Sequence, residues 1–120
     1  MAQIMICDDS LFMRMMLKKI LEGSGHKVVA EAGTGREAVK LYLMHKPDVV
    51  TMDITMPELD GISALREILV EDVRARVVMV SAIGQQGVVT EAIQAGAADF
   101  IVKPFETERV LAVVNNMLTK

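Results

Sequence analysis

Residues 49–57, with the sequence VVTMDITMP, place a carboxylate after four strand-forming residues and a proline four positions later. Segments of helical periodicity lie on both sides of residues 49–52, so these residues predict a buried parallel strand. In an open parallel sheet, functional side chains gather in the crevice beyond the carboxyl ends of the strands. Asp53, at the end of this strand, is therefore the first candidate for a site residue.

Three more apolar segments end in reactive side chains, as this one does: residues 4–7 in Asp8 and Asp9, residues 77–80 in Ser81, and residues 100–102 in Lys103. Parallel strands would open all of these ends onto one edge of the sheet. Three carboxylates, a hydroxyl and an ammonium would then surround a single crevice. Each residue alone is a common strand-end or surface residue, whereas the set in this order strongly indicates a functional site.

Five strand-like segments, beginning near residues 4, 28, 49, 77 and 100, alternate with segments of helical periodicity. After the first strand, Ser10 can cap a helix whose apolar residues recur at i, i+3, i+4, i+7 and i+8, namely Met13, Met16, Leu17, Ile20 and Leu21. Asp60-Gly61 opens a later helix, and residues 85–95 and 106–118 predict the last two. The pattern is a βα unit repeated five times. It predicts an α/β fold, a doubly wound three-layer sandwich with residues 27–32 as a polar edge strand.

Length and composition narrow the function further. At 120 residues the chain has the size of one domain, and we expect a single domain over residues 1–120 with no second domain appended. The net charge of −3 and the scattered basic residues argue against nucleic acid as a partner. Cys7 fits a core thiol in a reducing compartment, and no apolar segment approaches membrane-spanning length. We therefore expect a cytoplasmic monomer with no membrane partner.

These residues resemble those of response-regulator receiver domains, and within that family the single-domain regulators of chemotaxis. The matching motifs span the chain: Asp8-Asp9, Met52-Asp53, Met56-Pro57, Asp60-Gly61, Ser81-Ala82, Gly96-Ala97, Asp99-Phe100 and Lys103-Pro104-Phe105. The resemblance, rather than the residues themselves, implies a flavodoxin-like (βα)5 sheet of strand order 2-1-3-4-5. The first and third strands are neighbours in that order, so the three carboxylates would share one crevice.

Crowded carboxylates call for a cation. Two unit charges about 5 Å apart repel by roughly 3 kcal/mol at an effective dielectric near 20. Solvent-accessible oxygen ligands suit Mg²⁺, which keeps several waters and bridges carboxylates to phosphate oxygens. The resemblance implies that Asp9, Asp53 and the backbone carbonyl of Thr55 bind Mg²⁺ directly, and that Asp8 acts mostly through water.

The resemblance also implies the chemistry. Asp53 would be the phosphoacceptor, and the Lys103 ammonium and Ser81 hydroxyl would stabilise the transferring group. The protein would be a phosphorylation-activated two-component response regulator of bacterial chemotaxis, a signalling phosphoacceptor that catalyses its own phosphoryl transfer and dephosphorylation rather than an enzyme. Phosphorylation would move Ser81 and the aromatic ring of Phe100, where many chemotaxis regulators carry Tyr. A cis Lys103–Pro104 bond is implied too, although X-Pro bonds alone predict trans.

The implied partners are a CheA-type histidine kinase as phosphodonor, a flagellar motor switch protein as target, and a chemotaxis phosphatase. The output surface would comprise the helix after Gln85, the strand at Phe100 and the last helix. Phe12 and Met15 lie off the inward face of the first helix and are candidates for docking the kinase or phosphatase. An apolar Ile83 would shield the phosphoryl group from water.

Other readings remain open. A stand-alone receiver that acts as a phosphorelay intermediate or a phosphate sink would have nearly the same sequence. A phosphatase of the haloacid-dehalogenase type is disfavoured because Asp8 and Asp9 are adjacent, where that family has Asp-x-Asp. A flavin-binding protein is disfavoured because no hydroxyl- and glycine-rich loop follows the first strand.

Overall fold

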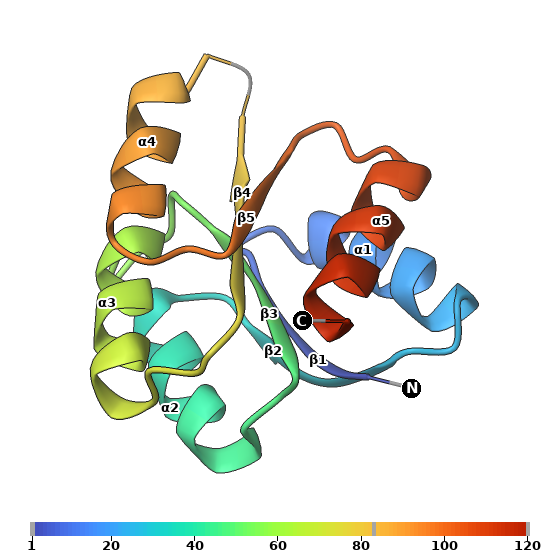
Figure 1. Cartoon of the computed structure of the whole chain (residues 1–120), viewed down its shortest axis with the longest axis horizontal. Coiled ribbons are helices and arrows are strands. Elements are labelled where there is room, and N and C mark those ends of the chain that lie inside the picture. Colours follow the sequence, from blue (N-terminus) through green and yellow to red (C-terminus); the bar gives the residue numbers. More distant parts are fainter. Residues whose placement is uncertain (1, 83, 120) are drawn as a thin grey trace.

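Five parallel strands form the middle layer of the protein, in the order β2-β1-β3-β4-β5 (Figure 1). The computed structural model describes residues 2–82 and 84–119. The strands are β1 (Gln3–Cys7), β2 (Lys27–Ala32), β3 (Val49–Asp53), β4 (Val77–Ser81) and β5 (Asp99–Val102). The predicted α/β fold and its strand order are both confirmed.

Helices cover both faces of this sheet (Figure 1). On one face lie α1 (Leu11–Gly23) and α5 (Thr107–Leu118), and on the other α2 (Gly35–His45), α3 (Gly61–Glu71) and α4 (Gln86–Gln94). Among the described residues, no helix has both the length and the apolar character to span a membrane.

Two hydrophobic cores result from the two-residue period of the strands. Successive side chains of a strand point to opposite faces, so each inner strand contributes to both cores. In β1, Ile4 and Ile6 pack towards α1 and α5, whereas Met5 and Cys7 pack towards α2 and α3. This double burial explains why the inner strands have continuous apolar sequences, and why β2, at the edge, is more polar.

Three of the helices begin with a side-chain cap at the carboxyl edge of the sheet. The side chains of Ser10, Thr34 and Asp60 each accept a hydrogen bond from the N–H three residues later, at 3.2, 3.1 and 2.8 Å. The N-cap residues of α4 and α5, Gln85 and Glu106, make no such side-chain hydrogen bond. The start of α4 is thus less firmly fixed than the starts of α1, α2 and α3.

The turn after β3 folds tightly against α3. The Gly61 N–H donates to the Ile54 carbonyl at 2.8 Å, and a Cβ at position 61 would lie 1.9 Å from the carbonyl oxygen of Asp53. Only glycine fits this approach, which holds the start of α3 directly beneath the end of β3.

Candidate functional site

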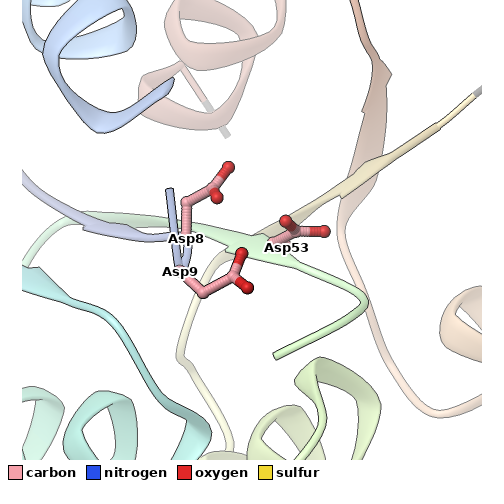
Figure 2. Close-up of side chains that lie close together, drawn as sticks. All are labelled: Asp8, Asp9 and Asp53. Carbon is pink, nitrogen blue, oxygen red and sulfur yellow. The ribbon is translucent and has the colours of Figure 1, made fainter. Parts of the chain in front are cut away.

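Three carboxylates meet where β1 and β3 end (Figure 2). Cys7 pairs with Met52 in adjacent parallel strands, which brings Asp8 and Asp9, just after β1, next to Asp53, the last residue of β3. One oxygen atom from each carboxylate lies within 4.8 Å of the others. Asp8 and Asp53 are buried, at 4% and 7% exposure, and Asp9 is exposed. The cluster is therefore open to solvent through Asp9.

Lys103 reaches this cluster from the far side of β4. Its Nζ lies 3.0 Å from Asp8 Oδ2 and 3.0 Å from Asp53 Oδ2, so one ammonium bridges two of the carboxylates. Its backbone N–H donates to the Ser81 carbonyl at 2.8 Å, which ties the end of β5 to the end of β4. The peptide bond between Lys103 and Pro104 is cis, as the family resemblance implies.

Burial and hydrogen bonding act in opposite directions on the pKa values of Asp53 and Lys103. Burial raises the pKa of Asp53, against the hydrogen bonds from Lys103 and from the Thr55 N–H, the latter at 3.3 Å. Burial works to lower the pKa of Lys103, but hydrogen bonds to Asp53 and Asp8 outweigh burial and raise it. Lys103 therefore stays protonated near neutral pH, and Asp53 is a desolvated carboxylate of raised basicity.

The donor set fits a hard divalent cation. At Mg–O distances of about 2.1 Å, octahedral ligands lie about 3 Å apart when adjacent and about 4.2 Å apart when opposite. The separation of the Asp8, Asp9 and Asp53 oxygens, within 4.8 Å, is close to this range. Thr55 follows in the exposed turn after β3, next to the cluster. Several positions facing solvent would be left for water or for a phosphate oxygen.

Arg14 of α1 holds the turn that carries Asp8 and Asp9. Its NH1 group donates to the Asp8 carbonyl at 2.5 Å, and its Nε donates to Glu31 of β2 at 3.1 Å. On either side of that carbonyl, the Asp8 N–H donates to Ala32 and the Ser10 N–H donates to the Asp8 carboxylate, each at 2.9 Å. Arg14 was not among the residues predicted from the sequence, where its only signal is a cation within an apolar helical segment.

Ser81 and Phe100 border one groove between the sheet and α4. Ser81 is buried at the end of β4, and Phe100 lies half-buried on β5. The groove has a volume of about 510 Å³, and Val89 and Ile93 of α4 form part of its wall. On α5, the Arg109 guanidinium lies 5.8 Å from the centre of the Phe100 ring and donates to the Phe100 carbonyl at 2.9 Å. The two expected switch residues thus share one cavity with α4.

The docking candidates lie at the same edge of the sheet as the acidic cluster. Phe12 and Met15, the two candidates, are 68% and 59% exposed in the first half of α1, and Leu11, which was not predicted, is 60% exposed beside them. Ile83, the expected shield of the phosphoryl group, lies outside the described residues.

Comparisons with known proteins found similar sequences and similar structures. A family model described as the response regulator receiver domain matches residues 4–115. The chemotaxis protein CheY of Bacillus subtilis is 60% identical over 116 residues, which cover 97% of each chain. CheY of Thermotoga maritima is 54% identical over 115 residues, which cover 96% of each chain. A solved CheX-CheY-BeF3-Mg complex from Borrelia burgdorferi aligns with a TM-score of 0.93 and 40% identity, covering 98% of this chain and 90% of that one.

Proposed function

Because this chain belongs to the response-regulator receiver domain family, we propose that it is a chemotaxis response regulator whose Asp53 side chain accepts a phosphoryl group. One observation carries the assignment to Asp53. Among the described carboxylates, Asp53 alone combines three features: it is the last residue of a central strand, its side chain lies 3.0 Å from Lys103 Nζ, and it belongs to the three-carboxylate cluster. Asp8 also touches Lys103 and, like Asp53, accepts the N–H of the residue two positions later, so it is the place of Asp53 at the end of the central strand β3 that distinguishes the two.

The residues of the site divide the reaction between them. An Asp53 oxygen attacks phosphorus, a new P–O bond forms, and the P–N bond of a donor phosphohistidine breaks as the imidazole leaves with the electron pair. The Lys103 ammonium and the Ser81 hydroxyl donate to oxygens of the transferring group. Asp9, Asp53 and the Thr55 carbonyl would hold Mg²⁺ directly, and Asp8 through water. A bound Mg²⁺ would supply charge neutralisation for the carboxylates and the phosphoryl oxygens.

Return to the resting state uses the same groups. Water attacks phosphorus, the bond between phosphorus and the Asp53 oxygen breaks, and inorganic phosphate leaves a free carboxylate. The catalysis therefore acts on the protein's own aspartyl phosphate, in keeping with a signalling regulator.

Intact mass measurement tests the proposal directly. The protein is incubated with acetyl phosphate, with Mg²⁺ or with a chelator, as wild type and as Asp53→Asn. We expect one phosphate adduct of about 80 Da that requires Mg²⁺ and is lost in Asp53→Asn. Asp60→Asn is the matched control, because Asp60 is an exposed carboxylate that caps α3, and Asn caps equally well. An adduct that persists in Asp53→Asn, or no adduct at all, would contradict the assignment.

The partners follow from the similarity to CheY proteins. We propose a CheA-type histidine kinase as donor, a flagellar motor switch protein as target and a phosphatase, with the whole chain acting as one cytoplasmic, monomeric receiver domain. The Borrelia burgdorferi CheY that resembles this chain was solved with CheX, which supports a partner of that type. A phosphorelay or phosphate sink is the alternative. Capture of a phosphotransfer protein and no motor component by the phosphorylated chain would favour it.

The exposed apolar residues of α1 are the proposed kinase contact. Phe12→Ser combined with Met15→Ser should slow transfer from the kinase and leave phosphorylation by acetyl phosphate unchanged. Val70→Ser with Val73→Ser is the control, because Val70, near the end of α3, and Val73, just after that helix, are 82% and 83% exposed. Equal kinase transfer in the two double variants would dismiss α1 as the contact.

A further inference from the structure

The loop between β4 and α4 contains one short hydrogen bond that the proposed mechanism does not use. The Ala82 N–H donates to the side-chain oxygen of Gln85 at 2.6 Å. Ala82 directly follows Ser81 and is exposed. The Gln85 side chain thus accepts the hydrogen bond of a backbone N–H at the edge of the sheet that carries the acidic cluster.

The strand ladder shows which way this donor faces. Along a strand, consecutive residues direct their backbone groups to opposite neighbours. The Val80 carbonyl accepts from Ile54, just past β3, at 3.1 Å, and the Ser81 carbonyl accepts from Lys103, past β5, at 2.8 Å. The alternation directs the Ala82 N–H back to the β3 side, just beyond Asp53.

Within residues 2–82 and 84–119, no backbone acceptor meets the Ala82 N–H on that side. Continued pairing would bring the Ile54 carbonyl opposite it, but that carbonyl already accepts from Gly61 at 2.8 Å. The β3 chain turns away there, and the space beyond Asp53 is where the phosphoryl group would stand. The Ala82 N–H is therefore a donor at the phosphoryl position, and Gln85 holds it.

We propose that Gln85 is a displaceable latch, a neutral acceptor that holds the Ala82 N–H until a phosphoryl oxygen on Asp53 takes it. The inference rests on the proposed function, since it requires phosphorylation of Asp53. An anionic phosphoryl oxygen is a stronger acceptor than a carboxamide, so it wins the donor once formed. Until then the bond to Gln85 competes with phosphorylation and favours the resting state.

Release of Gln85 would reach the output surface in one step. Gln85 is the N-cap residue of α4, and its side chain makes no cap hydrogen bond to that helix. Gly84 beside it has a φ of +94°, a backbone conformation that lets the chain fold back towards Ala82. Gln85 also lines the groove that Phe100 and α4 share. The latch thus joins the phosphoryl site to the start of α4, which has no side-chain cap.

The test compares Gln85→Ala with Gln86→Ala by NMR of ¹⁵N-labelled protein. Gln86 is the matched control, because it is the adjacent exposed glutamine. Spectra are recorded free and with Mg²⁺ and beryllofluoride, a phosphoryl analogue. In the free protein, we expect Gln85→Ala alone to shift the Ala82 amide proton. With the analogue bound, wild type and Gln85→Ala should give the same Ala82 shift, since both then donate to the analogue.

Affinity supplies the second readout. Without the competing acceptor, Gln85→Ala should bind beryllofluoride about two- to tenfold more tightly than wild type, the range that one net hydrogen bond covers. Gln85→Glu should bind it more weakly, because a carboxylate holds the N–H more strongly and repels the anion. A bond that only stabilises the loop would give no gain in affinity and no convergence of the Ala82 shifts.

The outcomes distinguish a failure of the latch proposal from a failure of the proposed function. If Asp53 forms its Mg²⁺-dependent adduct but the Ala82 shift ignores beryllofluoride, the latch is wrong and the function stands. Equal affinities for Gln85→Ala and Gln86→Ala would also overturn the latch. Failure of the wild type to form any adduct would overturn the function and the latch together.

Discussion

The two sides of the site are built differently. The acidic side, residues 8–14 and 53–61, is held by many contacts: the Asp8 carbonyl, N–H and carboxylate all have partners, and α3 begins against the Asp53 carbonyl. Fewer contacts hold the described residues of the output side, residues 81–82 and 84–87. Beyond the end of β4, the Ala82 N–H donates to the Gln85 side chain, and α4 begins without a side-chain cap.

This difference matches what each side has to do. Phosphoryl transfer depends on fixed charges placed before the reaction, so the acidic side benefits from rigidity. A signal requires a segment with two arrangements of similar free energy, and a helix start with few contacts provides one. Variants that loosen the acidic side or tighten the output side test whether the contrast is real.

Gly61→Ala should have the largest effect, because it attacks the acidic side at its tightest point. The new Cβ would lie 1.9 Å from the Asp53 carbonyl oxygen and 2.9 Å from the Ile54 Cα, and backbone atoms cannot move aside as a flexible side chain can. We expect the free energy of unfolding to fall by about 3 kcal/mol or more, measured by urea denaturation. A loss below about 1 kcal/mol would mean that this side yields easily.

Arg14→Ala should come next, because it removes the anchor of the Asp8–Asp9 turn. Without the guanidinium, the Asp8 carbonyl loses its donor and Glu31 keeps only Lys18, at 3.6 Å. The Mg²⁺ concentration that gives half-maximal adduct formation should rise about tenfold, as for residues that orient metal ligands from behind. Arg14→Lys should restore part of the loss, because it keeps the charge but not the forked geometry.

The control for this prediction is Lys19→Ala, which removes an exposed cation from the same helix. Mg²⁺ titration followed by NMR, without phosphodonor, separates weaker metal binding from slower chemistry. An unchanged Mg²⁺ affinity in Arg14→Ala would mean that the turn keeps its shape without this anchor.

The contrast also marks what the sequence could and could not predict. Asp53 and Lys103 were identifiable because each ends an apolar strand, and parallel strands collect such ends at one edge. The strand order came only through the family resemblance. The Arg14 anchor and the Gln85 bond were not identifiable, because both depend on where a long side chain reaches after folding. The Thr51 hydroxyl, fully buried in β3 without a hydrogen-bond partner, could not be predicted either, because the sequence pattern predicts burial but not hydrogen bonds.

Asp53→Asn should stabilise the metal-free protein, because the rigid acidic side holds a carboxylate in an unfavourable place. Burial raises the pKa of Asp53 in the folded state, so the folded protein binds its proton more tightly than the unfolded chain does. Stability therefore falls as the pH rises through that raised pKa. At pH 7 and without metal, the free energy of unfolding of Asp53→Asn should therefore be higher than that of wild type, as measured by urea denaturation.

Two conditions should remove this gain. Below the pKa of an unfolded aspartate, wild type carries a protonated Asp53, and the two proteins should be about equally stable. Added Mg²⁺ should raise the melting temperature of wild type and close the gap, because it binds the folded form only. An Asp53→Asn protein less stable than wild type at pH 7 without metal would show that the contact with Lys103 outweighs the cost of burial.

Gly87→Ala should have the smallest effect and the opposite sign to Gly61→Ala. Gly87 is the second residue of α4, and a Cβ there would meet no heavy atom within 4 Å. Alanine is favoured over glycine in a helix by up to about 1 kcal/mol, and near a helix end we expect a gain of about 0.5 kcal/mol in urea denaturation. Adduct formation with acetyl phosphate should not change, since Gly87 touches neither Asp53 nor the bond between Ala82 and Gln85. A loss of stability instead would mean that the start of α4 is packed as closely as the start of α3, and the contrast between the two sides would then fail.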